Sequence, residues 1–296
     1  MKNTIFRGAA TALVTPMNSD GSVDFDALGR LIDFQIEGGI SALVITGTTG
    51  ESSTLSDEEH KEAIAFAVKK SAGRVPVIAG TGSNDTDYAI ALSRFACQAG
   101  ADALLLVTPY YNKATQKGLI AHFTAIADAV TKPIILYNVP SRTGCNLKPE
   151  TVACLAEHPR IVGIKEASGD LSQVADLASL CGDKIDIYSG NDDQILPILS
   201  LGGAGVISVL SNLVPGETDA ICQHYFKGEN EKATSLQLRY LPLIRLLFCE
   251  VNPIPAKAAA SAMGFGENVL RLPLTPMEEA NYLRLMKEMK EQNILA

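Results

Sequence analysis

The sequence predicts a (β/α)8 barrel, an α/β fold in which eight parallel strands alternate with helices, followed by a helical C-terminal subdomain. Short apolar segments recur at nearly even spacing, the intervals between them have helical periodicity, and only helical patterns follow the last segment. The segments begin about 20 to 33 residues apart, as successive βα units do. The eight predicted strands are residues 9–14, 42–46, 75–79, 103–107, 133–138, 161–165, 185–189 and 206–209.

The intervals between the strands carry the marks of helices. Apolar residues recur three and four positions apart, as at Leu28, Leu31 and Ile32. Ser56 and Glu59 have the spacing of a capping box, and Pro149 suits the first turn of a helix. We therefore expect a helix after each of the strands.

Glycine-containing phrases stand between several helices and the strands that follow them. Four of these phrases begin at Gly38, Gly100, Gly182 and Gly202. Because glycine adopts the left-handed conformation that ends a helix, we expect a left-handed cap in each phrase. The alternative fold is a doubly wound open sheet, but its dinucleotide fingerprint G-x-G-x-x-G is absent, since Ser83 follows Gly80-Thr81-Gly82.

After the eighth strand the sequence predicts helices alone, over residues 220–226, 231–250, 255–263 and 276–292. This tail of roughly 70 residues is too long to be the last helix of a barrel. We therefore expect two units: the barrel over residues 1–224 and the helical subdomain over residues 225–296.

Composition and charge exclude several classes of protein. The 296 residues carry a net charge of −8, with no cluster of basic residues, which disfavours nucleic acid and anionic membranes as partners. No apolar run approaches the roughly 20 residues that span a bilayer. The six cysteines show no C-x-x-C pairing and suit a reducing compartment. We expect a cytoplasmic protein.

Lys165 and Tyr137 are the most informative single residues. Active sites of such barrels lie where the strands end, and both residues end predicted strands. Alternation places Ile161, Gly163 and Lys165 on one face, where Gly163 would leave room for a bound molecule. A buried lysine with a lowered pKa can form a Schiff base, and a phenol can relay protons. The alternatives remain open: a lysine that reaches solvent or pairs with Glu166, and a tyrosine with its hydroxyl in water.

Other strand ends carry weaker signals. Thr48 and Thr49 lie in a glycine-framed loop that can hold a carboxylate or be an ordinary turn. Arg142 offers a planar fork for a carboxylate, although a loop arginine is often simply solvated. Tyr110 and Tyr111 follow the fourth strand, and one of them is expected to pack. Gly190 follows the seventh strand.

Missing motifs narrow the chemistry further. The four histidines, His60, His122, His158 and His224, lack zinc-site spacing, and neither a G-x-S-x-G elbow nor a Walker loop occurs. Asp192 and Asp193 after the seventh strand would repel a phosphate. We therefore expect no metal and no cofactor, which leaves covalent amine chemistry on a small oxo acid.

Several motifs resemble the dihydrodipicolinate synthase family, within the pyruvate-dependent class I aldolases that include N-acetylneuraminate lyase. The likeness covers essentially the whole chain. It rests on Gly47-Thr48-Thr49-Gly50-Glu51-Ser52, Pro109-Tyr110-Tyr111-Asn112, residues 137–144, Gly163-Ile164-Lys165-Glu166, residues 205–209 and Asn252-Pro253-Ile254-Pro255-Ala256-Lys257. The resemblance implies a lyase that condenses pyruvate with L-aspartate 4-semialdehyde in the diaminopimelate and lysine branch. The alternatives are an aldolase acting on a sugar oxo acid and a non-catalytic ligand-binding barrel.

The resemblance also implies roles for individual residues. Lys165 would be the Schiff-base lysine and Tyr137 the proton donor and acceptor, linked through Thr48 to Tyr111 of a neighbouring subunit. The residues that would bind substrate are Thr49, Ile207, Arg142 and Gly190. The implied assembly is a homotetramer, a dimer of dimers.

An effector site is implied as well, and it departs from the family pattern. Its residues would be Ser52, His60, Asn84, Tyr88 and Tyr110. Lysine-inhibited relatives have a glutamate where this chain has Tyr88, and some have a histidine where it has Asp57. Without that glutamate the ammonium of a bound lysine loses an anionic partner, so we expect weak or absent inhibition by lysine.

Overall fold

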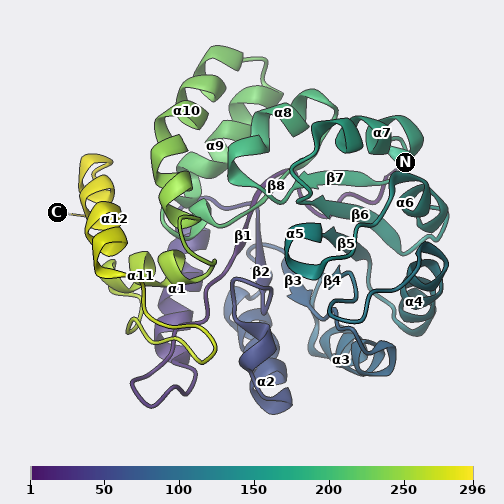
Figure 1. The fold of residues 1–296 in the computed structure, drawn as a ribbon, viewed down its shortest axis with the longest axis horizontal. Coiled ribbons are helices and arrows are strands. Elements are labelled where there is room, and N and C mark those ends of the chain that lie inside the picture. The colour runs from purple at the N-terminus through teal and green to yellow at the C-terminus, as the bar shows by residue number, and fades with distance from the viewer. Residues whose placement is uncertain (1, 296) are drawn as a thin grey trace.

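Eight parallel strands close into a barrel in the computed structural model, which describes residues 2–295 (Figure 1). The strands follow one another in chain order, and β8 pairs with β1. They are β1 (Gly8–Ala12), β2 (Ala42–Ile45), β3 (Val77–Gly80), β4 (Ala103–Val107), β5 (Ile134–Asn138), β6 (Ile161–Glu166), β7 (Asp186–Ser189) and β8 (Gly205–Ser208). Each overlaps one predicted segment, and the predicted barrel is confirmed.

Helices surround the strands, because the outward side chains of the barrel need an apolar cover. Leu43 and Ile45 of β2, for example, share one large buried cluster with Leu28, Leu31 and Ile32 of α1. The covering helices are α1 (Phe25–Glu37), α2 (Asp57–Ser71), α3 (Thr86–Ala99), α4 (Gln116–Ala129), α6 (Pro149–Leu155), α7 (Leu171–Cys181), α8 (Ile195–Ser200) and α9 (Pro215–Phe226). The short helix α5 (Pro140–Thr143) lies in the loop after β5.

The barrel interior is filled by a second buried cluster, to which the strands contribute alternate residues. Small side chains such as Ala10, Ala42 and Ala103 are combined there with larger ones, including Ile135 and Tyr137. Phe6 and Tyr188 stack in this cluster, with ring centroids 4.3 Å apart, and the Tyr188 hydroxyl donates to the carbonyl oxygen of Phe6 at 2.9 Å. These rings belong to the amino-terminal part of the barrel.

Strand β6 corrects two details of the predicted alternation. Its pairing with β5 shifts by one residue, because Ile134 lies opposite Ile161 whereas Ile135 lies opposite Gly163. Ile161 therefore joins the outer cluster, and only Gly163 and Lys165 face inward. The space beside Gly163 is not free for a ligand, since a Cβ there would lie 3.2 Å from the Tyr188 ring.

The helix ends agree with the sequence in part. Both hydrogen bonds of the Ser56–Glu59 capping box form, and Pro149 is in the first turn of α6. Gly100 and Gly202 have the expected left-handed conformation. In the phrase at Gly38 the left-handed residue is Gly39, and Gly182 is right-handed, so a left-handed cap there is wrong. After α7 the N–H groups of Lys184 and Ile185 both donate to the backbone oxygen of Cys181.

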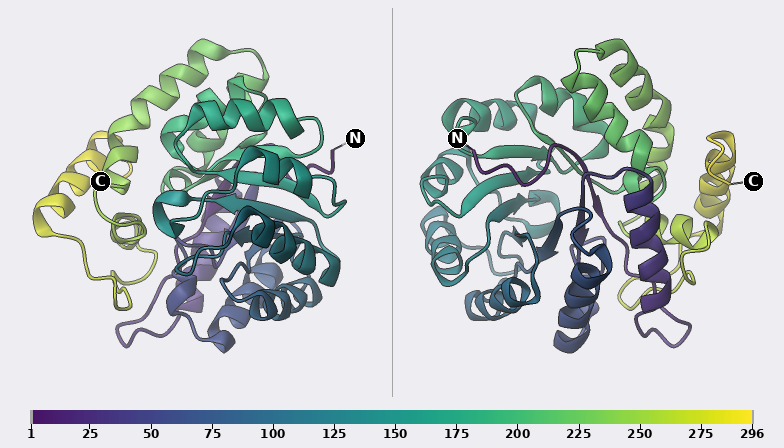
Figure 2. Two further views of the ribbon diagram at one scale, coloured as in Figure 1. Left: turned by 45° about the vertical axis from the view of Figure 1, so that its right-hand side comes forward. Right: turned by 180° about the vertical axis from the view of Figure 1, so that it is seen from behind.

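Three further helices follow the barrel: α10 (Asn230–Leu247), α11 (Ile254–Ala262) and α12 (Glu279–Glu291). Figure 2 shows them along one side of the barrel, with α10 beside α8 and α9 and with α12 outermost. Helix α9 continues through residue 224 to Phe226, so we propose that the barrel ends in the turn after Phe226. Within residues 2–295, no helix has both the length and the apolar character needed to cross a membrane.

Candidate active site

Lys165 and Tyr137 lie side by side inside the barrel, near the ends of β6 and β5. The two residues are register partners, and the Lys165 Nζ atom lies 4.4 Å from the centroid of the Tyr137 ring. Each residue is only 6% exposed. Burial therefore excludes both a lysine that reaches solvent and a tyrosine whose hydroxyl stands in water.

Burial lowers the pKa of Lys165 to about 8, because the ammonium loses its hydration. The positive charge of Arg142 lowers this pKa further, while the carboxylate of Asp192 opposes the shift. Glu166 faces away and accepts hydrogen bonds from Asn138, Gln173 and the backbone N–H of Ser168. Among the described residues no ion pair includes Lys165, so a sizeable fraction of its amine is neutral near pH 7 to 8.

Tyr137 is suited to move protons without carrying a lasting charge. Burial raises the pKa of its phenol, while Arg142 and a hydrogen bond with Thr48 pull that pKa down. The phenol is therefore protonated at neutral pH, and the two neighbours favour a transient phenolate. Thr48 is thus near enough to act on the Tyr137 phenol, and the predicted relay through Thr48 stays a prediction.

The loop after β2 brings two threonines to the site. Thr49 is 3% exposed, and its Oγ1 accepts a hydrogen bond from the side-chain amide of Asn252 at 3.0 Å. Thr48 borders a cavity of about 570 Å³ at the mouth of the barrel. The loop is therefore held in place by the tail and lines the cavity, unlike an ordinary exposed turn.

Arg142, in α5, borders the same cavity as Thr48. Its Nη1 donates to the backbone oxygen of Asn252 at 3.4 Å. The guanidinium is thus held at the mouth, and its effect on the pKa values of Lys165 and Tyr137 shows that it acts on both. A carboxylate entering the cavity would meet it.

Ile207 and Gly190 complete the predicted set. Ile207 lies fully buried in the interior cluster. A Cβ on Gly190 would lie 2.6 Å from the Cβ of Ala167 and 3.2 Å from the Lys165 Cε, so a larger residue there would displace the lysine. Of the predicted residues, Tyr137 and Gly190 directly adjoin Lys165, and the substrate-binding roles of the others stay predictions.

Sequence patterns alone give no role to two residues that act on the site. Asp192 is 2% exposed; its Oδ2 accepts hydrogen bonds from the N–H groups of Val209 and Leu210, and its negative charge acts on Lys165. Asn252, which begins the tail motif, contacts both Thr49 and Arg142. The only sequence signals are an acidic residue after β7 and an asparagine in the tail, and neither identifies a partner.

The residues of the implied effector site lie around the same mouth. Ser52, His60, Tyr88 and Tyr110 border the cavity, and the Asn84 side chain donates to the backbone oxygen of Tyr110 at 3.3 Å. Burial lowers the pKa of His60, so this imidazole is neutral at pH 7. The Tyr88 hydroxyl donates to Asp57, whose other carboxylate oxygen pairs with Lys61 at 2.5 Å.

Tyr111 differs from the other predicted residues because it is 92% exposed. It borders the cavity from the loop after β4 and has a left-handed backbone with φ of +71°. The structure does not bring its hydroxyl to Thr48 within one chain.

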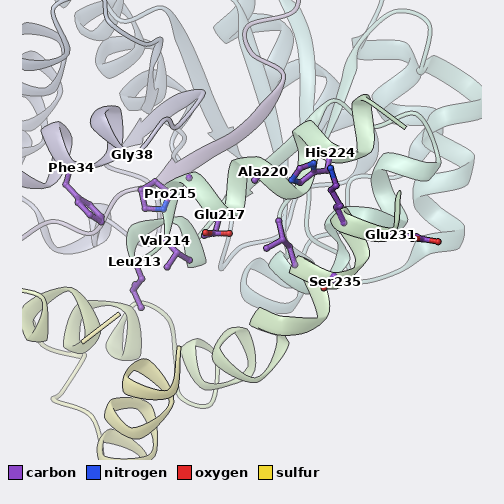
Figure 3. Close-up of a pocket in the computed structure, with 13 residues that line it drawn as sticks. Phe34, Gly38, Leu213, Val214, Pro215, Glu217, Ala220, His224, Glu231 and Ser235 are labelled. Carbon is purple, nitrogen blue, oxygen red and sulfur yellow. The ribbon is translucent and has the colours of Figure 1, made fainter. Parts of the chain in front are cut away.

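A larger cavity, of about 920 Å³, lies between α1, α9 and α10 (Figure 3). Its walls are largely apolar, as Figure 3 shows for Phe34, Leu213 and Val214. His224 is the one imidazole that borders it among the described residues, and this side chain is paired with Glu229 at 2.5 Å. The cavity contains none of the predicted site residues, so we assign the chemistry to the barrel mouth.

The geometry at the mouth supports addition of an amine to a carbonyl. It combines a partly neutral buried amine, a neighbouring phenol and a guanidinium, which suit a nucleophile, a proton carrier and a carboxylate anchor. Residues 2–295 hold no group of three or more histidine, cysteine or acidic side chains placed to bind a metal.

Comparisons with known proteins agree with one another. A family model described as the dihydrodipicolinate synthetase family matches residues 5–292. The chain is 56% identical, over 98% of its length and 100% of the relative, to the 4-hydroxy-tetrahydrodipicolinate synthase of Alkaliphilus oremlandii.

Solved structures of the same family superpose closely on this chain. The chloride-inhibited dihydrodipicolinate synthase from Acinetobacter baumannii, complexed with pyruvate, has a TM-score of 0.96 and 45% identity, covering 99% of this chain and 100% of the other. The synthase from Cyanidioschyzon merolae with lysine bound has a TM-score of 0.96 and 41% identity, with the same coverage.

Proposed function

The chain belongs to the dihydrodipicolinate synthetase family, and from this premise we propose that Lys165 and the residues around it carry the family's reaction. The activity is that of a 4-hydroxy-tetrahydrodipicolinate synthase, a Schiff-base-forming lyase of lysine biosynthesis. The curated relatives support this activity and not the alternative on a sugar oxo acid.

The first half of the reaction binds pyruvate to the enzyme. The neutral Nζ of Lys165 attacks the keto carbon, and the resulting carbinolamine loses water to give a protonated imine. Tyr137 donates a proton to the departing hydroxyl. The loop of Thr48 and Thr49 binds the carboxylate of pyruvate, Ile207 and Gly190 shape the pocket around it, and Arg142 anchors a carboxylate at the mouth. The imine then withdraws electrons, which eases transfer of a methyl proton to the phenolate left on Tyr137 and gives an enamine.

The second half joins the two substrates. The enamine carbon attacks the aldehyde carbon of aspartate semialdehyde, and the alkoxide that forms takes up a proton from Tyr137. The Tyr137 phenolate then removes a proton from the substrate's ammonium group. The substrate's own amine then adds to the imine carbon and expels the Lys165 amine, which closes the ring. One water is released in all, from the first half, and the lysine is regenerated.

The observation that supports this assignment most is the buried, unpaired Lys165 beside Tyr137. Borohydride reduction in the presence of pyruvate tests it, because reduction turns the imine into a stable amine. Mass spectrometry should find the reduced pyruvyl adduct on Lys165. An enzyme that remains active but shows no adduct there would refute the assignment.

Tyr137→Phe tests the proton carrier separately. The substitution removes only the hydroxyl from a buried ring, so we expect a folded enzyme with kcat lower by about 10²- to 10⁴-fold. Steady-state assays measure the loss. Tyr188→Phe is the matched control, since that hydroxyl bonds to Phe6 and lies away from the mouth. A Tyr137→Phe enzyme with nearly full kcat would contradict the role.

We further propose a homotetramer made of tight dimers, in which Tyr111 reaches the Thr48 of a neighbouring subunit. The 92% exposure of Tyr111 at the edge of the cavity supports an intermolecular contact. We also propose that the enzyme acts in the cytoplasm, which its six free cysteines favour.

A further inference from the structure

A buried ion pair joins the helical tail to the loop that carries Thr48 and Thr49. The Nζ of Lys257, in α11, lies 2.5 Å from the Oε1 of Glu51, and the two side chains are 2% and 1% exposed. Every other ion pair among residues 2–295 leaves at least one side chain more than a fifth exposed. Neither residue belongs to the chemistry described above.

Glu51 occupies a demanding backbone position. It has a left-handed conformation, with φ of +55° and ψ of +34°, which residues other than glycine seldom adopt. Its N–H donates to the backbone oxygen of Thr48 at 3.1 Å. The position of Glu51 is therefore coupled to the backbone of Thr48 through this turn.

The tail holds this loop at further points. The N–H of Arg271 donates to the second oxygen of Glu51 at 3.3 Å, and the Arg271 guanidinium pairs with Glu59 in α2. Asn252 donates to the Thr49 hydroxyl and accepts from Arg142. The loop, the tail and the arginine at the mouth are thus parts of one connected network.

Stability alone does not account for a buried ion pair. Its desolvation offsets most of the attraction, and a well-packed apolar pair in the same place is often as stable. Burial lowers the pKa of Lys257, while the attraction to Glu51 opposes that shift. The cost of desolvation and the attraction between the charges thus act against each other. The charges add a defined position, because an ammonium and a carboxylate attract each other at one short distance and so fix the two segments relative to each other.

We propose that the Lys257–Glu51 pair holds the threonine loop in the position that binds the carboxylate of the oxo-acid substrate. Glu51 and Lys257 are then positioning residues, which act through Thr48 and Thr49. This inference rests on the proposed function of those two threonines. It gives the helical tail a part in substrate binding, although the tail contributes no group to the bond-making steps.

The test measures how much pyruvate half-saturates borohydride trapping on Lys165. The double variant Glu51→Gln with Lys257→Met removes both charges together, which avoids leaving one of them buried alone. We expect the half-saturating concentration to rise about tenfold, because a loop displaced by a fraction of an ångström binds the carboxylate poorly. Trapping at saturating pyruvate should remain close to that of the unmodified enzyme, so KM changes more than kcat.

Glu59→Gln is the matched control. It weakens the attachment of Arg271 to α2 but leaves the Lys257–Glu51 pair in place, so half-saturation should change less than about twofold. Thermal melting of each variant shows whether it is folded. Should the double variant fail to fold, Glu51→Gln alone is expected to shift half-saturation in the same direction.

Two results would overturn the inference. One is a folded double variant, or a folded Glu51→Gln variant, that half-saturates at the same pyruvate concentration as the unmodified enzyme. The other is an equal shift in Glu59→Gln, which would mean that any loosening of the tail has the same effect. Absence of trapping in the unmodified enzyme would instead refute the proposed function itself.

Discussion

At the scale of single residues, Lys165, the proposed Schiff-base lysine, shows how burying an amine lowers stability. Its pKa in the folded protein is about 8, against an ordinary value of 10.5, so folding disfavours the charged form. The unfolded chain therefore binds the proton more tightly, and stability should rise as the pH increases from about 8 to about 10.5. At pH 7 the full penalty applies.

Lys165→Met should therefore be more stable than the unmodified enzyme while it loses all activity. We expect a gain of roughly 1 to 3 kcal/mol in the free energy of unfolding at pH 7, since each tenfold loss of proton affinity on folding costs about 1.4 kcal/mol and the pKa of about 8 already includes the attraction to Asp192. Urea denaturation at pH 7 and pH 10 measures the gain, which should shrink at pH 10. The control Lys117→Met, at an exposed lysine, should leave the free energy of unfolding nearly unchanged. An equal gain in that control would contradict a role for burial.

Tyr88 is the expected reason why free lysine inhibits this enzyme weakly or not at all. The nearby carboxylate of Asp57 already pairs with Lys61, so it is poorly placed to receive a second ammonium. We predict weak or absent inhibition by lysine, and a half-inhibitory concentration about tenfold lower in Tyr88→Glu, which supplies a free carboxylate. Steady-state assays with Tyr88→Gln as the uncharged control measure both. Potent inhibition of the unmodified enzyme would refute the prediction.

At the scale of elements, the strands are predictable because each is a short apolar run that is buried on both faces. The inward position of Lys165 follows from the same alternation. The shift at Ile161 does not, because it depends on how β6 pairs with β5, and the sequence of one strand says nothing of its partner. The sequence also does not show what fills the space beside Gly163, because the Tyr188 ring that fills it comes from another strand, β7.

Gly163→Ala tests how tightly β6 and β7 fit together. The added methyl would lie 3.2 Å from both the Tyr188 ring and the backbone oxygen of Asp186, so one strand must move. We expect the free energy of unfolding to fall by about 1 to 3 kcal/mol, as measured by chemical denaturation. Gly118→Ala is the control, because that glycine is in α4 with ordinary contacts and its substitution should be neutral or stabilising. Equal stability of the two variants would show that β6 and β7 can accommodate a methyl group at position 163, which would contradict the close packing described here.

At the scale of the whole molecule, the proposed crossing of Tyr111 between subunits predicts that two inactive variants rescue each other. Lys165→Ala and Tyr111→Ala are each expected to be nearly inactive alone. When they are unfolded, mixed in equal amounts and refolded together, half of the dimers are mixed, and each mixed dimer has one intact site. We expect about a quarter of the unmodified activity. A mixture no more active than its components would show that Tyr111 serves its own chain.

The contacts that join the tail to the barrel are the part of the site that the sequence conceals. Glu51 and Lys257 are separated by 206 residues, and Asn252 lies 203 residues after the threonine that it contacts. Helical periodicity predicts that the tail exists, but it does not show which barrel loop the tail touches. Such long-range contacts become visible only in three dimensions.

The stacked rings of Phe6 and Tyr188 have a consequence for the order of events during turnover. They fill the barrel toward its amino-terminal end, so both reactants have to share the mouth beside Arg142. In the proposed mechanism the reactant that bonds to Lys165 lies deepest, so we expect it to enter first and the second reactant to bind above it. A second reactant that arrives early stands in the way. The two packed rings therefore favour one order of entry, with pyruvate before aspartate semialdehyde.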